Sequence, residues 1–377
     1  MSEAKDLRAT ALVASYERAG YAPAAPAILQ PAEPFLDLSG EDIRRRMYLI
    51  TDSGTGEELC LRPDLTIPVA RDYLASPAAG QPAKFCYLGP VFRQRGDGPA
   101  EFLQAGIESF GRADTAAADA ETLALAIEAT AHYGLAAPAI RMGDVALFSA
   151  LIAALDLAPA WKRRLAKDFN RKSSLAHDLD RLVLGSPNGK PEYQGVLAAL
   201  ANSDPRAARA LVTDLLSIAG ITAVGGRSVG EIADRFLEQA ELGAGSALPG
   251  ATRAVIERFL AVSGDPNAAL LALRALADEA QLALAPALDL FESRAGLLAK
   301  RGIDLKRIHF STAFGRGLDY YTGMVFELHD PGGKVQGELV AGGRYDGLFA
   351  RLGAVQPVPA VGFAAWIDGL VGLGGRK

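Results

Sequence analysis

The chain has 377 residues, half of them hydrophobic, and its 39 Lys and Arg stand against 44 Asp and Glu, for a net charge of −5. A chain of this length can bury a sizeable core and divide into two or three domains. The acidic balance argues against a nucleic-acid ligand, because phosphate binding usually requires a basic stripe. No apolar run is long enough to span a bilayer, so we expect no membrane association.

The cysteines, the histidines and the N-terminal stretch indicate the cellular compartment and whether a metal or cofactor is expected. The two cysteines, Cys60 and Cys86, have neither metal-site nor redox-motif spacing, and so few thiols favour a reducing, cytoplasmic compartment. The stretch 1–12 mixes charged and small residues, so we expect no secretory signal. The four histidines are scattered along the chain, and we therefore predict neither a metal site nor another cofactor.

Helical and strand-like patterns alternate over the first 150 residues. Glycines follow two of the predicted helices, as is common at helix ends, and the run 52–56 is typical of a hairpin turn. The elements predicted here are a helix over 6–19, hairpin strands over 47–51 and 58–61, a helix over 66–74, strands over 83–88 and 101–110, and a helix over 113–133.

Two further zones follow. Residues 151–300 are rich in Ala and Leu with helical periodicity, which predicts a mostly helical insertion. Residues 301–377 return to strands, so we predict a discontinuous α+β core of 1–150 and 301–377, with one sheet assembled from distant segments. The elements predicted in the last zone are strands over 307–313, 320–329 and 338–341 and helices over 346–352 and 365–373.

A carboxylate and a hydroxyl stand two residues apart at Asp64 and Thr66. In extended backbone both side chains would face the same way, and such a pair of acceptors suits an ammonium group. Asp64 could instead cap the helix predicted from residue 66, and the motif alone favours this simpler role.

The predicted strand over 101–108 carries Gln104 and Glu108 on one face, with Gly106 between them. The glycine predicts a gap that another group can approach closely. A polar binding surface and a solvated sheet face explain this pattern equally well.

Two glycine-rich stretches, 315–321 and 341–347, each contain an arginine, an acid and tyrosine. Arginine binds carboxylates bidentately, and neighbouring glycines allow close backbone approach. Each stretch alone is more simply a turn with surface charges. Combined with the earlier motifs, they supply acceptors for an ammonium group, an arginine for a carboxylate, and an acid with tyrosines for a ring N–H. A polar amino acid requires this set of partners.

The order of these stretches resembles histidyl-tRNA synthetase, a class II aminoacyl-tRNA synthetase. The match covers most of residues 6–150 and 305–373, and several motifs in order are far more specific than any one alone. The resemblance implies an antiparallel sheet flanked by helices. The matching segments are 20–48 for the first class II signature, 62–66, 87–93 and 102–108 for the second and the stretch leading into it, 316–321 and 341–346 for two histidine-specific motifs, and 360–364 for the start of the third signature.

The resemblance also implies a histidine pocket, carried over position by position. Its departure from the family pattern is an aspartate at position 64, where the family has glutamate. The implied contacts are Asp64, Thr66 and Gln104 to the α-amino group, Arg316 to the carboxylate with Arg93 nearby, and Glu108, Tyr321 and Tyr345 to the imidazole with Tyr320 beside them.

The ATP side departs further from the family pattern. Arg95 stands where the family has the glutamate of Phe-Arg-x-Glu, the basic loop that follows is shortened, and Gly369 replaces the arginine that contacts ATP phosphates. Losing one such preorganised contact lowers a rate about 10²–10³-fold, so we expect negligible adenylation. The sequence stops soon after the third signature, and we expect no anticodon-binding domain.

A histidine pocket without ATP chemistry resembles the regulatory subunits of ATP phosphoribosyltransferase. Membership would imply a non-catalytic subunit that binds histidine for feedback control of the first step of histidine biosynthesis. It would also imply a homodimer within a hetero-octamer with the short-form catalytic subunit. A truncated or divergent histidyl-tRNA synthetase is the alternative, and it predicts histidine-dependent exchange of pyrophosphate into ATP. A third hypothesis, an unrelated binding or scaffold role, predicts no histidine binding.

Overall fold

A computed structural model describes residues 7–38, 43–96, 98–169, 175–180, 205–218, 250–318 and 320–374. The chain divides into two compact units, one formed by 1–150 with 259–377 and the other by 151–258. The second unit ends earlier than the predicted insertion, which ran to residue 300. Helices α13 (Pro266–Glu279) and α14 (Ala285–Lys300) belong to the first unit, because α13 packs on β9 (Ile308–Ser311) and α14 on α5 (Thr115–His132).

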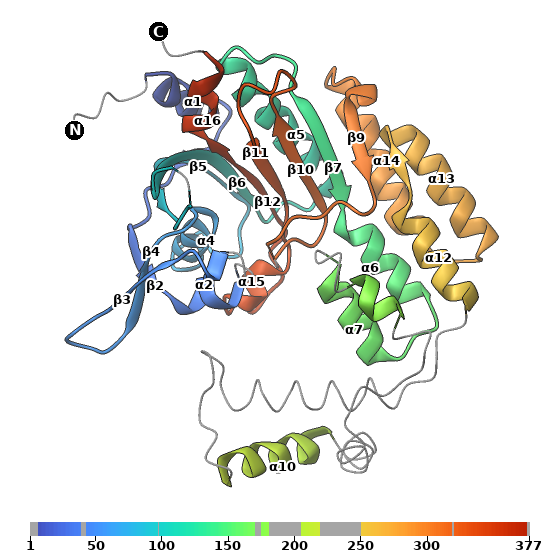
Figure 1. Ribbon diagram of the computed structural model, residues 1–377. Coiled ribbons are helices and arrows are strands. Elements are labelled where there is room, and N and C mark those ends of the chain that lie inside the picture. The colour runs from blue at the N-terminus through green and yellow to red at the C-terminus, as the bar shows by residue number, and fades with distance from the viewer. Residues whose placement is uncertain are drawn as a thin grey trace. The chain divides into compact units, whose positions relative to one another are not determined.

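A large sheet organises the first unit (Figure 1). Its central strands are antiparallel, and parallel pairs occur only toward the edges, between β1 and β5 and between β7 and β9. In spatial order the nine described strands are β1 (Ala22–Pro23), β5 (Ala83–Phe92), β6 (Glu101–Phe110), β12 (Ala360–Trp366), β11 (Glu338–Arg344), β10 (Met324–His329), β7 (Ala139–Asp144), β9 and β8 (Ser263–Gly264).

The sheet joins segments that are far apart in the sequence, as predicted. Strand β6 pairs with β12, and β7 pairs with β10. The prediction missed β12: residues 360–364 were matched only to the start of the third signature. The helix predicted over 365–373 included the last two residues of the strand, ahead of the helix α16 (Ile367–Leu373). Strand β11 also continues through Arg344, so residues 341–344 are strand and not a glycine-rich turn.

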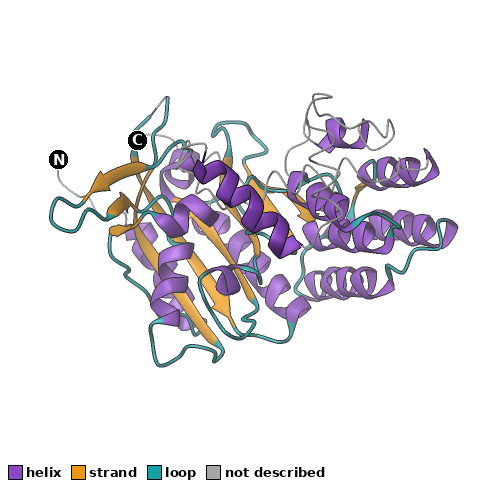
Figure 2. Cartoon of the chain, turned by 90° about the horizontal axis from the view of Figure 1, so that it is seen from below, coloured by secondary structure: helices purple, strands orange, loops and turns teal. Residues whose placement is uncertain are grey.

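Two helices cover one face of this sheet. Helix α1 (Leu7–Arg18) packs on β5 and β6, and α5 packs on β11 and β12 with α14 behind it. Figure 2 shows the helices lying along the strands. The helices predicted over 6–19 and 113–133 are thereby confirmed, and positive φ angles at Gly20 and Gly134 end both of them.

Buried ion pairs tie these helices to the sheet. Arg294 of α14 donates to Asp119 of α5 at 2.8 Å and to Asp144, the last residue of β7, at 2.7 Å. Arg344, at the end of β11, lies 2.7 Å from the other Asp119 oxygen. The backbone oxygen of Arg344 accepts the Thr322 N–H at 2.9 Å. The network therefore fixes the chain segment that enters β10.

The other face carries a second core. A three-stranded sheet in the order β2 (Leu29–Pro31), β4 (Glu58–Leu61), β3 (Tyr48–Thr51) lies there with the helices α2 (Glu33–Leu38), α4 (Thr66–Leu74) and α15 (Leu348–Arg351). The hairpin and the helix over 66–74 match their predictions. The ring of Tyr73 packs on those of Phe110 and Phe349, at centroid distances of 5.1 and 5.4 Å.

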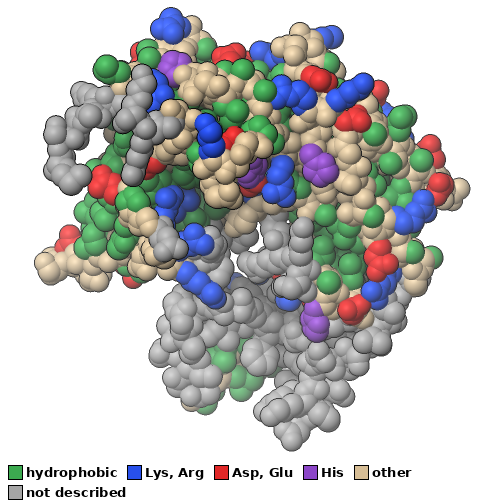
Figure 3. Space-filling model, turned by 45° about the horizontal axis from the view of Figure 1, so that its top comes forward, with side chains coloured by type: hydrophobic (Ala, Val, Ile, Leu, Met, Phe, Trp, Pro, Cys, Tyr) green, Lys and Arg blue, Asp and Glu red, His purple; other side chains and the backbone are tan. Residues whose placement is uncertain are grey.

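The remaining described helices are α6 (Val145–Ala154), α7 (Pro159–Asp168), α10 (Pro205–Ile218) and α12 (Gly250–Leu260). None of the described helices is long and apolar enough to cross a membrane. On the face seen in Figure 3, basic and acidic side chains of described residues are interspersed. That face therefore carries no stripe of one sign among the residues that the structure describes.

Candidate ligand-binding site

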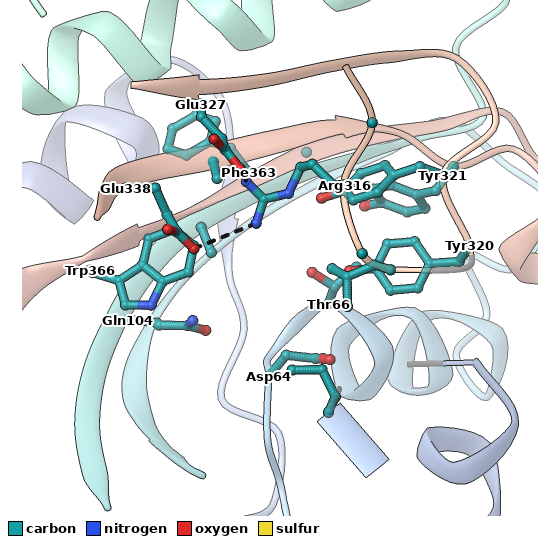
Figure 4. Close-up of a pocket in the computed structure, with 18 of the residues that line it drawn as sticks. Asp64, Thr66, Gln104, Arg316, Tyr320, Tyr321, Glu327, Glu338, Phe363 and Trp366 are labelled. Carbon is teal, nitrogen blue, oxygen red and sulfur yellow. Dashed lines mark hydrogen bonds and ion pairs between the residues drawn. The ribbon is translucent and has the colours of Figure 1, made fainter. Parts of the chain in front are cut away.

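A cavity of about 230 Å³ lies in the first unit, bordered by the start of α4, the strands β6, β11 and β12, and the loop before β10. Figure 4 shows Tyr320 and Tyr321 at one end and Trp366 with Gln104 at the other. The volume suits a small polar metabolite, since pockets for drug-sized ligands usually begin at about 300 Å³.

Most of the residues singled out in the sequence meet at this cavity, although they come from five separate stretches of the chain. Glu108 is the exception, because it lies behind the wall and not on it. The predicted residues that line the cavity are Asp64, Thr66, Arg93, Gln104, Arg316, Tyr320, Tyr321 and Tyr345.

Asp64 lies both at the first turn of a helix and on the wall of the cavity. Its Oδ1 accepts the backbone N–H of Ile67 at 3.1 Å, in the first turn of α4, and the side chain also lines the cavity. Burial raises the pKa of this carboxyl group. Thr66 is the first residue of the helix and not part of an extended strand, and its hydroxyl donates to Glu108 at 2.7 Å. The expected pair of acceptors is thus only half available to a ligand.

The face of β6 that carries Gln104 and Glu108 is buried, and the interpretation as a solvated sheet face is wrong. Gly106 does leave a gap, but Tyr87 fills it: a Cβ at this glycine would lie 2.5 Å from the Tyr87 hydroxyl. That hydroxyl donates to Glu108 at 3.2 Å. The glycine therefore admits a tyrosine of the protein and leaves no space for a ligand.

Glu108 is fully buried and accepts three hydroxyl groups. Tyr87 and Thr66 donate to one oxygen, and Tyr345 donates to the other. Desolvation raises the pKa of Glu108 to about 8, while the three hydrogen bonds act in the opposite direction. Gly362 opposes Glu108 across β12 and β6, and a Cβ there would lie 1.9 Å from a carboxylate oxygen. The glycine is thus required for the position of the carboxylate.

Three tyrosine rings form one wall. The centroid of Tyr320 lies 4.9 Å from that of Tyr321 and 5.6 Å from that of Tyr345. Because Tyr345 also donates to Glu108, this wall joins flat apolar surface to a buried carboxyl group.

Arg316 extends along the cavity toward Glu338 (Figure 4). Its Nη1 lies 3.1 Å from Glu327, and its Nη2 lies 3.9 Å from Glu338. Its Nε is buried without a hydrogen-bond partner among the described residues, and so is Oε1 of Gln104. Orphaned polar atoms of this kind are costly in a native protein, so the cavity presents one unsatisfied donor and one unsatisfied acceptor.

Arg344 takes no part in the cavity, although its stretch resembles that of Arg316. It lies on the opposite face of the sheet, against Asp119 of α5. The sequence reasoning also missed several residues that line the cavity. The alternation of side chains along β10 could have identified Glu327 as a lining residue. No sequence pattern identified the residues of β12, because this strand was not predicted. The missed lining residues with large side chains are Glu327, Glu338, Phe363 and Trp366.

No cluster of His, Cys, Asp or Glu suitable for a metal ion occurs among the described residues. The cavity itself combines cationic, anionic and aromatic groups from the second and third class II signatures and from both histidine-specific stretches. Fold and site together define a histidyl-tRNA synthetase-like protein, and the family model described as histidyl-tRNA synthetase matches residues 2–228 and 210–370.

Sequence relatives identify the family to which the chain belongs within this class. The ATP phosphoribosyltransferase regulatory subunits of Brucella canis and Brucella suis are each 42% identical to this chain over 352 residues, which is 93% of the chain and 92% of each relative. The chain therefore belongs to the family of ATP phosphoribosyltransferase regulatory subunits.

Solved structures support the fold. An ATP phosphoribosyltransferase regulatory subunit/histidyl-tRNA synthetase from Bacillus halodurans superposes with a TM-score of 0.64 at 23% identity, covering 98% of this chain and 78% of the other. A histidine–tRNA ligase subunit from Alicyclobacillus acidocaldarius gives 0.58 at 25% identity, covering 99% and 94%.

Proposed function

We propose that this chain is a non-catalytic subunit that binds free histidine for feedback control of ATP phosphoribosyltransferase, in the first step of histidine biosynthesis. Its partner would be the short-form catalytic subunit, in a hetero-octamer. Family membership supports the partner, and the cavity supports the ligand.

One observation carries the choice of ligand: an unsatisfied buried donor on Arg316 and an unsatisfied buried acceptor on Gln104 border the same cavity. A zwitterionic amino acid supplies an anion to the first and an ammonium group to the second. Asp64 adds negative charge on the ammonium side. A guanidinium has the fork geometry that binds a carboxylate bidentately, and Nη2 of Arg316, 3.9 Å from Glu338, is more loosely paired than Nη1.

The tyrosine wall and Glu108 suit an imidazole. A flat ring can pack against Tyr320 and Tyr321, and its N–H groups can meet the hydroxyl of Tyr345, which Glu108 holds in place. In this arrangement Glu108 acts on the ring through Tyr345. Arg93 donates its Nε–H to the Pro63 carbonyl at 2.7 Å and also lines the cavity, where its positive charge lies close to Asp64.

The lack of ATP chemistry is supported by the second-signature segment. The guanidinium of Arg95 lies 3.6 Å from the centroid of the Phe102 ring, at a position where the synthetase pattern has a glutamate. Gly369, in α16, supplies no side chain for phosphate contact. A histidine-dependent exchange of pyrophosphate into ATP would favour the synthetase alternative instead.

The test is to mix the protein with a short-form catalytic subunit and follow phosphoribosyl-ATP formation with and without histidine. We expect the mixture to be inhibited by histidine, and Arg316→Met to abolish that inhibition while still co-eluting with the partner. Arg274→Met is the matched control, because Arg274 forms only surface ion pairs with Asp289 and Glu292. Failure of the two proteins to co-elute, or inhibition that survives Arg316→Met, would reject the proposal.

A further inference from the structure

The carboxylate subsite contains an acid of its own. Glu327 lies on the same sheet face as Ala341 of the cavity wall, which it opposes across β10 and β11. Its Oε1 lies 3.1 Å from Nη1 of Arg316, and both side chains are largely buried. A ligand carboxylate that binds Arg316 therefore lies beside a second carboxylate that already pairs with the same arginine, and Glu338 lies 3.9 Å from its Nη2.

The other oxygen of Glu327 faces His329, which does not line the cavity. The two oxygens are divided between Arg316 on one side and Nε2 of His329, at 3.1 Å, on the other. The second ring nitrogen of His329, Nδ1, lies 3.0 Å from the Gly337 carbonyl oxygen. Both ring nitrogens thus face acceptors, and only an imidazolium carries a hydrogen on each of them.

We propose that Glu327 and His329 are positioning residues that tune Arg316 for the ligand carboxylate, with protonated His329 drawing Glu327 away from the arginine. This inference rests on the proposed function, since it needs a ligand with a carboxylate. Neither residue has to touch the ligand, because both act through the guanidinium.

A count of charges gives the direction of the effect. With His329 protonated, the ligand carboxylate and Glu327 face two cations, Arg316 and His329. With His329 neutral, two carboxylates share one arginine, and Glu327 binds it more firmly because its competitor is gone. Binding of a carboxylate should therefore weaken as His329 loses its proton, and ligand binding should be accompanied by proton uptake.

The groups around His329 do not reverse this sign. Arg141 of β7 opposes Glu327 and lies 3.8 Å from it, half exposed. Glu338 of β11 opposes His329 across the strands. Pairing with Glu327 raises the pKa of His329 and outweighs both burial and Arg141. In the turn that follows, Asp330 is held by the backbone N–H groups of 332, 334 and 335, and the charge of Lys334 lies close to it.

The experiment compares histidine with histidinol, which has the same ammonium and imidazole but a hydroxymethyl group in place of the carboxylate. Calorimetric affinities are measured for the full chain between pH 5.5 and 8, in buffers of different ionisation enthalpy. We expect the preference for histidine over histidinol to fall about threefold to tenfold as pH rises through the His329 titration. Proton uptake should accompany histidine binding and exceed that of histidinol.

Variants separate this role from a structural one. His329→Gln and Glu327→Gln should both make the histidine-to-histidinol ratio independent of pH, and Glu327→Gln should raise histidine affinity at pH 8. The control His132→Gln, on α5 across the sheet, should behave as wild type. A ratio that keeps its pH dependence in His329→Gln overturns the inference and leaves the histidine site intact. Absence of any histidine binding in the wild type overturns the proposed function and this inference together.

Discussion

The Thr66 hydroxyl donates a 2.7 Å hydrogen bond to Glu108, joining the first turn of α4 to the middle of β6. The bond connects a helix on one side of the cavity to the strand on the other. Both residues were identified from the sequence, but only Thr66 reaches the cavity surface. Glu108 is therefore a group whose ionisation affects both the fold and the site.

The pH dependence of stability follows from the burial of Glu108. Because its pKa rises from 4.5 to about 8, the folded chain binds a proton that the unfolded chain has lost between these values. The stability contribution is fully present below about pH 4.5 and is lost as pH rises through 8. Glu108→Gln keeps the hydrogen-bonding shape and removes the titration. In denaturant unfolding from pH 5 to 8, the free energy of unfolding of the variant should increase relative to that of the wild type. A difference between the two that stays constant with pH would contradict this expectation.

Removal of the Glu108 side chain should also reduce ligand affinity. Glu108→Ala leaves the hydroxyls of Thr66 and Tyr345 without their acceptor, whereas Tyr87 keeps the Phe363 carbonyl oxygen at 3.2 Å. Stranded buried groups cost about 1–3 kcal/mol each. We expect histidine binding, measured by calorimetry, to weaken at least tenfold. Glu101→Ala, at the exposed start of the same strand, is the control. Wild-type affinity in Glu108→Ala would mean that the ring does not bind at this wall.

Sequence patterns predicted the local elements well and the partners across the sheet poorly. The helix over 66–74 and the strand over 101–110 have the predicted bounds, because periodicity and turn residues act locally. The pairing that brings Gln104 opposite Trp366 is set by distant segments that no local pattern connects. Alternation along β10 could have indicated Glu327, but only the pairing of β10 with β11 places it beside the cavity.

Local sequence patterns also did not predict the roles of two glycines. Gly106 was expected to leave space for a ligand, and the structure fills that space with Tyr87. Gly362 attracted no attention in the sequence, yet its missing side chain makes room for Glu108. Which neighbour fills the space at a glycine depends on strand register, and register became known only with the fold.

Gly362→Ala tests this packing. The added methyl group would overlap Glu108 Oε2 at 1.9 Å and the Ile107 carbonyl oxygen at 2.4 Å, so strands β6 and β12 must separate locally. Overpacking of this kind costs about 1–3 kcal/mol, and displacement of Glu108 should lower histidine affinity as well. Gly296→Ala in α14, where nothing lies within 4 Å, is the control and should retain both properties. Thermal unfolding and calorimetry would measure the two effects, and wild-type values in Gly362→Ala would contradict the packing.

The buried arginine that anchors α14 should matter more for stability than any surface pair. Arg294→Met leaves Asp119 and Asp144 with buried charge and one partner fewer, and breaking such a pair costs about 3–5 kcal/mol. Arg274→Met, which breaks only exposed pairs, should change the free energy of unfolding little. Equal effects of the two variants in denaturant titrations would show that the buried network adds no stability of its own.

The outer face of the small sheet is apolar and supports the proposed homodimer. Leu29 and Ile50 are 45% and 41% exposed, and strand register places both on the same face as Leu59 and Leu61 of β4. A contiguous apolar patch of this kind on a folded chain usually marks an interaction surface. Ile50→Lys puts a charge in this patch, on the edge strand β3, and should shift the chain toward monomer in sedimentation experiments. Leu271→Lys, at a leucine on α13 that is 71% exposed, should leave the assembly unchanged. A dimer that persists in Ile50→Lys at low micromolar concentration would place the dimer contact elsewhere.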